Sequence, residues 1–193
     1  MRPTLLPVVL PVAIFSFLGG VCLGKSRRGL SMLPPERSSP LPGVPRLAWE
    51  KFVAIMVVAP KAHRSKRGRL GYFGMDARRL ADLELVRNPR KVRLGGEDGV
   101  WAGDWVAPLT EDGFLGSAEA QLEAFNRSCR RLASKAAPHV GEVVDGRRAS
   151  LSGLLAVGHL AGEEGIAGWT LDPAVRKRFE ATTARFAEAN GIF

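Results

Sequence analysis

Apolar residues recur at helical spacing in the first half of the chain. Residues 47–58 place a buried face at Trp49, Phe52, Val53 and Met56, and Pro60 blocks continuation of that helix. A second, shorter helix is expected within residues 71–86, where Leu80, Leu83 and Val86 supply the core contacts. Both segments therefore predict helices with one inward face.

The second half of the chain has longer helical patterns. Ser117 opens an amphipathic helix that runs to about Lys135 and turns Leu122, Phe125, Cys129 and Leu132 inward. Asp172 and Pro173 provide the N-cap and first position of a final helix. Its expected inward residues are Val175, Phe179 and Phe186, and its expected stop is Asn190 and Gly191.

The stretch Leu151–Trp169 differs from these because no side of it is persistently polar. Such a helix belongs inside a domain, and its glycines allow neighbouring elements to approach closely. Ser150 is the expected N-cap, and Gly162 is expected to end the helix in a left-handed turn. It carries His159, which we interpret as a core histidine because no Ser or Cys nucleophile pattern accompanies it.

Two short segments carry turn signals, and the first of them has the pattern of a β-hairpin. The glycine-rich stretch between Val92 and Trp105 predicts a small hairpin in which Trp101 and Trp105 either pack inward or form an exposed platform. Residues 143–148 predict a tight turn before the helix at Leu151. The fold class predicted is therefore mainly α, with a small β-hairpin.

An uncharged apolar run precedes this domain. Residues 3–24 are long enough to cross a bilayer, so residues 1–24 are expected to be a retained transmembrane anchor or a signal segment, with the anchor favoured. The basic residues Lys25, Arg27 and Arg28 follow directly and favour a cytoplasmic position for that flank. Residues 25–46 are rich in proline and predict a semi-rigid linker, which places the helical domain at residues 47–193.

The formal net charge of +9 is concentrated before residue 94, notably in the loop 61–69. This predicts attraction to an anionic polymer or surface, whereas nucleic-acid binding through so short a loop is not expected. Cys22 and Cys129 form no disulfide framework, and His63, His139 and His159 are far apart in sequence. No metal and no cofactor are expected.

Two segments carry a resemblance to a known family: the motif Gly71-Tyr72-Phe73-Gly74-Met75 and the later core helix at Leu155–Gly162. In these segments and in the order of its predicted elements, the chain resembles the lysozyme-like superfamily. The resemblance is to lytic transglycosylases and phage-tail muramidase-type domains. It implies a cell-envelope or periplasmic location and peptidoglycan as partner. The substrate-binding residues that follow from it and from the basic loop are Tyr72, Phe73, Met75, Arg64 and Trp101.

The same resemblance implies a catalytic glutamate at the end of the first helix, but Ala59 stands there. Glycosidic cleavage needs a carboxylic acid to protonate the leaving oxygen, and alanine cannot do so. Glu163 and Glu164 are the candidate replacements, whereas Glu50 is expected to be a solvated surface charge.

Two hypotheses follow from the missing acid. The chain is a peptidoglycan-engaging protein, either a glycosidase or lytic transglycosylase with a displaced acid or a non-catalytic relative. Alternatively, it is a non-enzymatic structural or adaptor protein of a membrane-associated or virion assembly that uses the same fold, since a fold does not fix a function.

Overall fold

The computed structural model describes residues 39–59 and 62–193, and it is mainly helical with a small antiparallel hairpin. The proposed membrane segment at residues 3–24, most of the linker, Pro60 and Lys61 lie outside the described residues. None of the helices in the described ranges has the length and apolar character needed to cross a membrane. In chain order the elements are α2 (Arg46–Met56), α3 (Ala77–Asp82), β1 (Val86–Leu94), β2 (Glu97–Trp105), α4 (Glu111–Gly116), α5 (Ala118–Ala136), the 3-10 turn η1 (Ala137–His139), β3 (Val143–Val144), β4 (Arg147–Arg148), α6 (Leu151–Ala161), α7 (Glu163–Leu171), α8 (Pro173–Arg178) and α9 (Glu180–Ala189).

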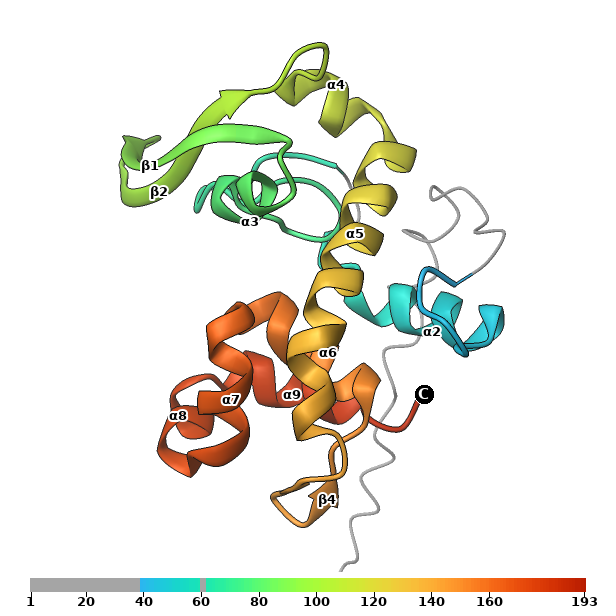
Figure 1. Cartoon of the computed structure of the whole chain (residues 1–193). Helices are drawn as coiled ribbons and strands as arrows, with labels where there is room; N and C mark the ends of the chain where they lie inside the picture. Colours follow the sequence, from blue (N-terminus) through green and yellow to red (C-terminus); the bar gives the residue numbers. More distant parts are fainter. Residues whose placement is uncertain (1–38, 60–61) are drawn as a thin grey trace, which may run out of the picture.

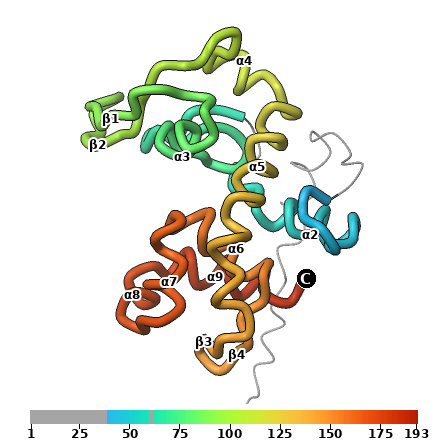
Figure 2. Tube along the Cα trace, viewed as in Figure 1, coloured from blue at the N-terminus to red at the C-terminus, as the bar shows by residue number. Residues whose placement is uncertain are grey.

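Helix α5 is a long central helix with a group of elements at each end. At one end it carries α3, α4 and the β1–β2 hairpin, and at the other end it packs against α6, with α7, α8 and α9 grouped around that helix (Figure 1). The Cα trace shows the chain completing the hairpin part before it returns along α5 to build the second part (Figure 2). Two groups of elements therefore flank one long helix.

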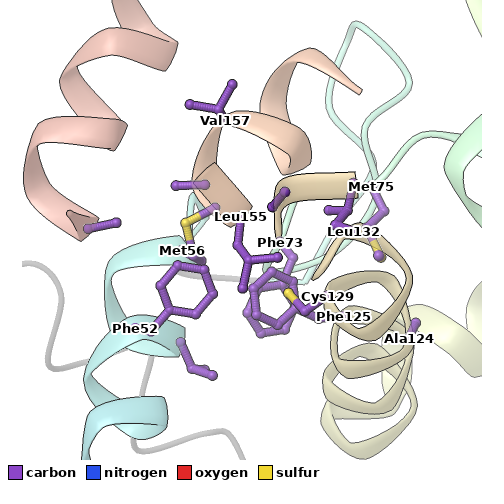
Figure 3. Packing of buried hydrophobic residues seen from close by; sticks show 14 of the residues in the cluster. Phe52, Met56, Phe73, Met75, Ala124, Phe125, Cys129, Leu132, Leu155 and Val157 are labelled. Atoms are coloured by element: carbon purple, nitrogen blue, oxygen red, sulfur yellow. The ribbon is translucent and has the colours of Figure 1, made fainter. Parts of the chain in front are cut away.

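The core forms where α2, α5 and α6 meet (Figure 3). The Phe125 ring of α5 stacks on that of Phe73, with centroids 4.2 Å apart and planes at 9°, and lies 6.0 Å from the rings of both Trp49 and Phe52. The buried faces expected for the first and third helices are confirmed, since these residues are all at most 6% exposed: Trp49, Phe52, Val53, Met56, Leu122, Phe125, Cys129 and Leu132.

Helix α6 has the boundaries expected from its sequence. The Ser150 hydroxyl accepts a hydrogen bond from the Gly153 N–H at 3.2 Å, and Gly162 ends the helix with a φ of 87°. A side chain at Gly158 would lie within 3.0 Å of Leu132 and Ile166, so the glycine is needed for the close approach of α5 and α7. The helix is therefore an interior scaffold element.

The predicted hairpin is present with one change in boundary, and the predicted turn at residues 143–148 connects a second pair of short strands. Strand β1 begins at Val86, which the sequence pattern had assigned to the preceding helix. Helix α3 ends earlier, at Asp82, and Glu84 adopts a positive φ of 61° that redirects the chain into the strand. In the β3–β4 hairpin the turn residues Asp145 and Gly146 have φ values of 49° and 79°, as a tight primed turn requires.

The C-terminal helix prediction was wrong in part. The structure divides it into α8 and α9 at Phe179, whose side chain was expected inward but is 48% exposed. Arg176 joins α8 to the end of α7, because its guanidinium donates to the carbonyl oxygens of Trp169 and Thr170 at 3.0 and 2.8 Å. The chain then restarts as α9, and Phe186 rather than Phe179 reaches the core.

Helix α4 was not expected from the sequence. Thr110 caps it by accepting a hydrogen bond from the Gly113 N–H at 3.0 Å, and Glu111 and Asp112 occupy its first turn. The cap and the two acids form a recognisable helix start, but only Phe114 of this short helix is buried. A helix with one core residue gives no periodic hydrophobic signal.

Substitution Gly71→Ala is expected to lower the free energy of unfolding by about 2 kcal/mol or more, because it adds a steric conflict to left-handed backbone strain. Gly71 has a φ of 72°, and an added Cβ would lie 2.2 Å from Oε1 of Gln121. That oxygen accepts from the Tyr72 N–H at 2.8 Å, and the side chain is 1% exposed. Urea denaturation followed by circular dichroism measures the change.

The matched control is Gly95→Ala, which has a φ of 57° and nothing within 4 Å of the added Cβ. This substitution introduces only the left-handed backbone strain, and it is expected to lower the free energy of unfolding by about 1 kcal/mol. Equal losses from the two substitutions would show that Gln121 does not contribute to the effect at Gly71.

Candidate functional site

A groove of about 320 Å³ lies between the hairpin part of the molecule and the junction of α6 with α7. The loop before α3 contributes Met75, the hairpin contributes Trp101, and α5 contributes Arg131. The opposite wall consists of residues 159–164. The groove therefore joins segments that are far apart in the sequence, and each wall is fixed by a regular element.

The groove is rich in arginine: Arg69, Arg78, Arg79 and Arg131 all line it. Arg79 is held in place, since it donates to the Gly158 carbonyl oxygen at 2.9 Å and approaches the Ser128 hydroxyl at 3.4 Å. It thereby ties α3 to the last turn of α6. Its role in the groove is structural as well as electrostatic.

Four carboxylates also line the groove, and two of them have defined tasks. Asp76 caps α3 by accepting from the Arg79 N–H at 2.8 Å. Glu163 forms an ion pair with Arg131, and this hydrogen bond and charge raise the pKa of the Arg131 guanidinium. The other two, Asp82 and Glu164, are exposed.

His159 lies at the inner wall of the groove. Its Nε2 is 2.7 Å from the Phe73 carbonyl oxygen, and because a carbonyl only accepts, Nε2 carries the proton. Burial lowers the pKa of His159 to about 4, with the neighbouring Arg79 charge acting in the same direction. The imidazole is therefore neutral at neutral pH and connects α6 to the loop that carries Phe73, in keeping with the core role expected from the sequence.

The end of the first helix and the Gly71–Met75 motif do meet in space. The backbone N–H groups of Val58 and Ala59 both point to the Tyr72 carbonyl oxygen, at 2.8 and 3.3 Å. In the described part of the chain, neither Ala59 nor Glu50 lines the groove. Glu50 instead bonds Arg46 at 3.0 Å on the surface of α2.

The five residues expected to bind substrate are divided by the structure. Met75 and Trp101 line the groove, although only 2% of Met75 is exposed. Phe73 is also 2% exposed and belongs to the aromatic core, while Tyr72 is 5% exposed beneath the surface. Arg64 pairs with Glu111 outside the groove, with Nε 2.7 Å from Oε1. The five side chains therefore do not form one binding surface, because only Met75 and Trp101 line the groove.

The sequence reasoning missed three arginines of the groove: Arg78, Arg79 and Arg131. The available signal was the Arg78-Arg79 pair, which lies in the first turn of the helix that Asp76 caps. Arg131 gave no signal, since it lies on the polar face of a long amphipathic helix.

No group of three or more His, Cys, Asp or Glu side chains in the described ranges is placed to hold a metal ion. Comparison with known proteins finds no matching family model, no matching curated protein and no matching solved structure. The groove and its chemistry are therefore the basis on which a function is proposed.

Proposed function

We propose that this chain is a lysozyme-like protein that binds the glycan strands of peptidoglycan in the groove and does not cut them. The observation that supports this most directly is Trp101 on the wall of a groove lined by four arginines. The absence of cleavage is supported by the groove itself, which Ala59 does not line and in which Glu163 is ion-paired with Arg131.

An indole ring at the wall of a groove suits a sugar. Its apolar face packs against the C–H face of a pyranose ring, and the surrounding polar groups bind the hydroxyl, amide and carboxylate substituents. Trp101 is half-buried, so part of its side chain is covered by the protein and part is accessible. The groove thus combines one aromatic surface with several charged groups.

The acids of the groove are poor candidates for the cleavage step. A general acid must hold a proton, which requires an apolar or unpaired environment for the carboxyl group. Glu163 is instead ion-paired with Arg131, and Glu164 is exposed to water. Binding without hydrolysis is therefore the activity that the groove supports best.

Trp101→Ala is expected to weaken binding of the full-length chain to purified peptidoglycan sacculi by about tenfold, the loss typical of one aromatic contact surface. Co-sedimentation over a range of sacculus concentrations measures the affinity. Phe179→Ala is the matched control, because Phe179 is a partly exposed aromatic residue on the α8–α9 side and does not line the groove.

The same samples test for cleavage by chromatography of the soluble fraction. We expect no released glycan fragments from the wild-type chain. Fragments that disappear on Glu163→Gln or Glu164→Gln would refute the non-catalytic function, and absence of sacculus binding would refute the whole proposal in favour of a structural or adaptor role.

A further inference from the structure

The groove has a basic end where two exposed arginines, Arg69 and Arg78, form no ion pair within the described residues. The loop at residues 65–69 is closed by hydrogen bonds, from the Ser65 N–H to the Arg69 carbonyl oxygen at 2.8 Å and from the Arg69 N–H to the Ser65 hydroxyl at 3.0 Å. Gly68 packs against the hairpin, where a Cβ would lie 2.3 Å from a methyl carbon of Val100. Arg69 is thus presented at the groove from an ordered turn.

Two further cations lie at the same end. The guanidinium carbon of Arg78 is 5.8 Å from the centroid of the Trp101 ring, and Nζ of Lys91 is 5.6 Å from it. Both distances are within the range of cation–π attraction. The ring proposed to contact a sugar therefore has two cations over it.

One carboxylate of the groove, Asp76, lies near Arg78 at the start of α3, where it accepts a hydrogen bond from the Arg79 N–H. Glu163 is paired with Arg131, which also donates to the Asp82 carbonyl oxygen at 3.1 Å, so these groups gather at the far end of α3. Arg69 and Arg78 are exposed and form no ion pair with any carboxylate of the described chain. Two exposed guanidinium groups that form no ion pair, one of them over the Trp101 ring, fit a ligand that brings its own negative charge.

We infer that Arg69 and Arg78 make the groove selective for sugar units that carry a carboxylate over neutral sugar units of the same backbone. This inference rests on the proposed function and specifies which glycan the groove prefers. Arg is suited to the role because its planar fork can donate two parallel hydrogen bonds to one carboxylate. A neutral sugar stacked on Trp101 would leave both guanidinium groups to water.

The test compares two soluble oligosaccharides by isothermal titration calorimetry with the full-length chain. One is a neutral tetramer of N-acetylglucosamine, and the other is a peptide-free peptidoglycan tetramer whose alternate sugars carry a lactyl carboxylate. The wild-type chain is expected to bind the acidic tetramer about tenfold more tightly at low salt, and added salt is expected to reduce that preference.

The double substitution Arg69→Ala with Arg78→Ala is expected to reduce the preference to less than about twofold while the affinity for the neutral tetramer changes by less than about twofold. The matched control is Arg93→Ala with Arg130→Ala, which removes two exposed arginines that do not line the groove. It should retain the wild-type preference, and circular dichroism checks that both variants are folded.

The outcomes separate the two proposals. Equal binding of both tetramers by the wild-type chain overturns the selectivity but leaves the proposed glycan binding intact. The selectivity is also overturned if the Arg69 and Arg78 double variant loses affinity for both tetramers equally. The same holds if the Arg93 and Arg130 control variant loses the preference for the acidic tetramer. Failure of the wild-type chain to bind either tetramer overturns the selectivity and counts against the proposed function itself.

Discussion

Phe125→Ala is expected to lower the free energy of unfolding by about 4 kcal/mol, the usual cost of removing a large aromatic side chain from a packed core. Phe125 is fully buried and contacts rings from three other parts of the chain: Phe52 at 6.0 Å, Phe73 at 4.2 Å and His159 at 5.2 Å between centroids. Its loss leaves a cavity that rigid neighbours cannot fill. Urea denaturation monitored by circular dichroism measures the effect.

Phe179→Ala provides the comparison, because the same change is made at a side chain that is 48% exposed. Its expected cost is within about 0.5 kcal/mol, as for most surface substitutions. A loss of stability at Phe179 similar to that at Phe125 would contradict the assignment of Phe125 to the centre of the core.

Acidification from pH 7 to pH 4 is expected to remove up to about 3 kcal/mol of stability through His159 alone. The folded-state pKa is lowered from 6.5 to about 4, chiefly because burial disfavours the imidazolium. Between these two values the unfolded chain binds more protons than the folded chain, so the free energy of unfolding falls as the pH decreases. The full contribution is present above pH 6.5 and is lost as the pH approaches 4.

His159→Gln isolates this effect from the titration of other groups. The glutamine amide can donate to the Phe73 carbonyl oxygen in place of Nε2, which lies 2.7 Å from it, but glutamine does not titrate. The difference in free energy of unfolding between wild type and variant, measured by urea denaturation at several pH values, should narrow or reverse toward pH 4. A constant difference across this range would refute the assignment of the acid sensitivity to His159.

Much of the fold could be predicted because its helices carry their own signals. Trp49, Phe52, Phe125 and Leu132 recur at helical spacing, and each is buried as expected. Ser150 and Gly162 mark the two ends of α6, because a cap and a left-handed terminal residue act within one turn of the chain. Local rules of this kind need no knowledge of the tertiary structure.

Predictions failed where packing between distant segments decided the outcome. Phe179 has suitable spacing for an inward position, yet the helix breaks there and Arg176 binds the carbonyl oxygens of Trp169 and Thr170 in α7. Phe73 belongs to a motif that resembles a substrate-binding segment, yet its ring stacks on Phe125 in the core. In both cases the sequence pattern was compatible with two environments, and long-range contacts selected one.

The helical class, one hairpin, the tight turn at residues 143–148 and most of the buried faces were predictable from the sequence, because hydrophobic periodicity, caps and turn residues act over a few residues. The sequence also predicted Ala59 at the end of the first helix, whereas α2 ends three residues earlier, at Met56. Only the tertiary structure decided that Arg69, Arg78, Trp101 and Glu163 line one groove. The physical reason is that a groove is formed by surfaces distant in the chain, whose relative position depends on how the whole core packs.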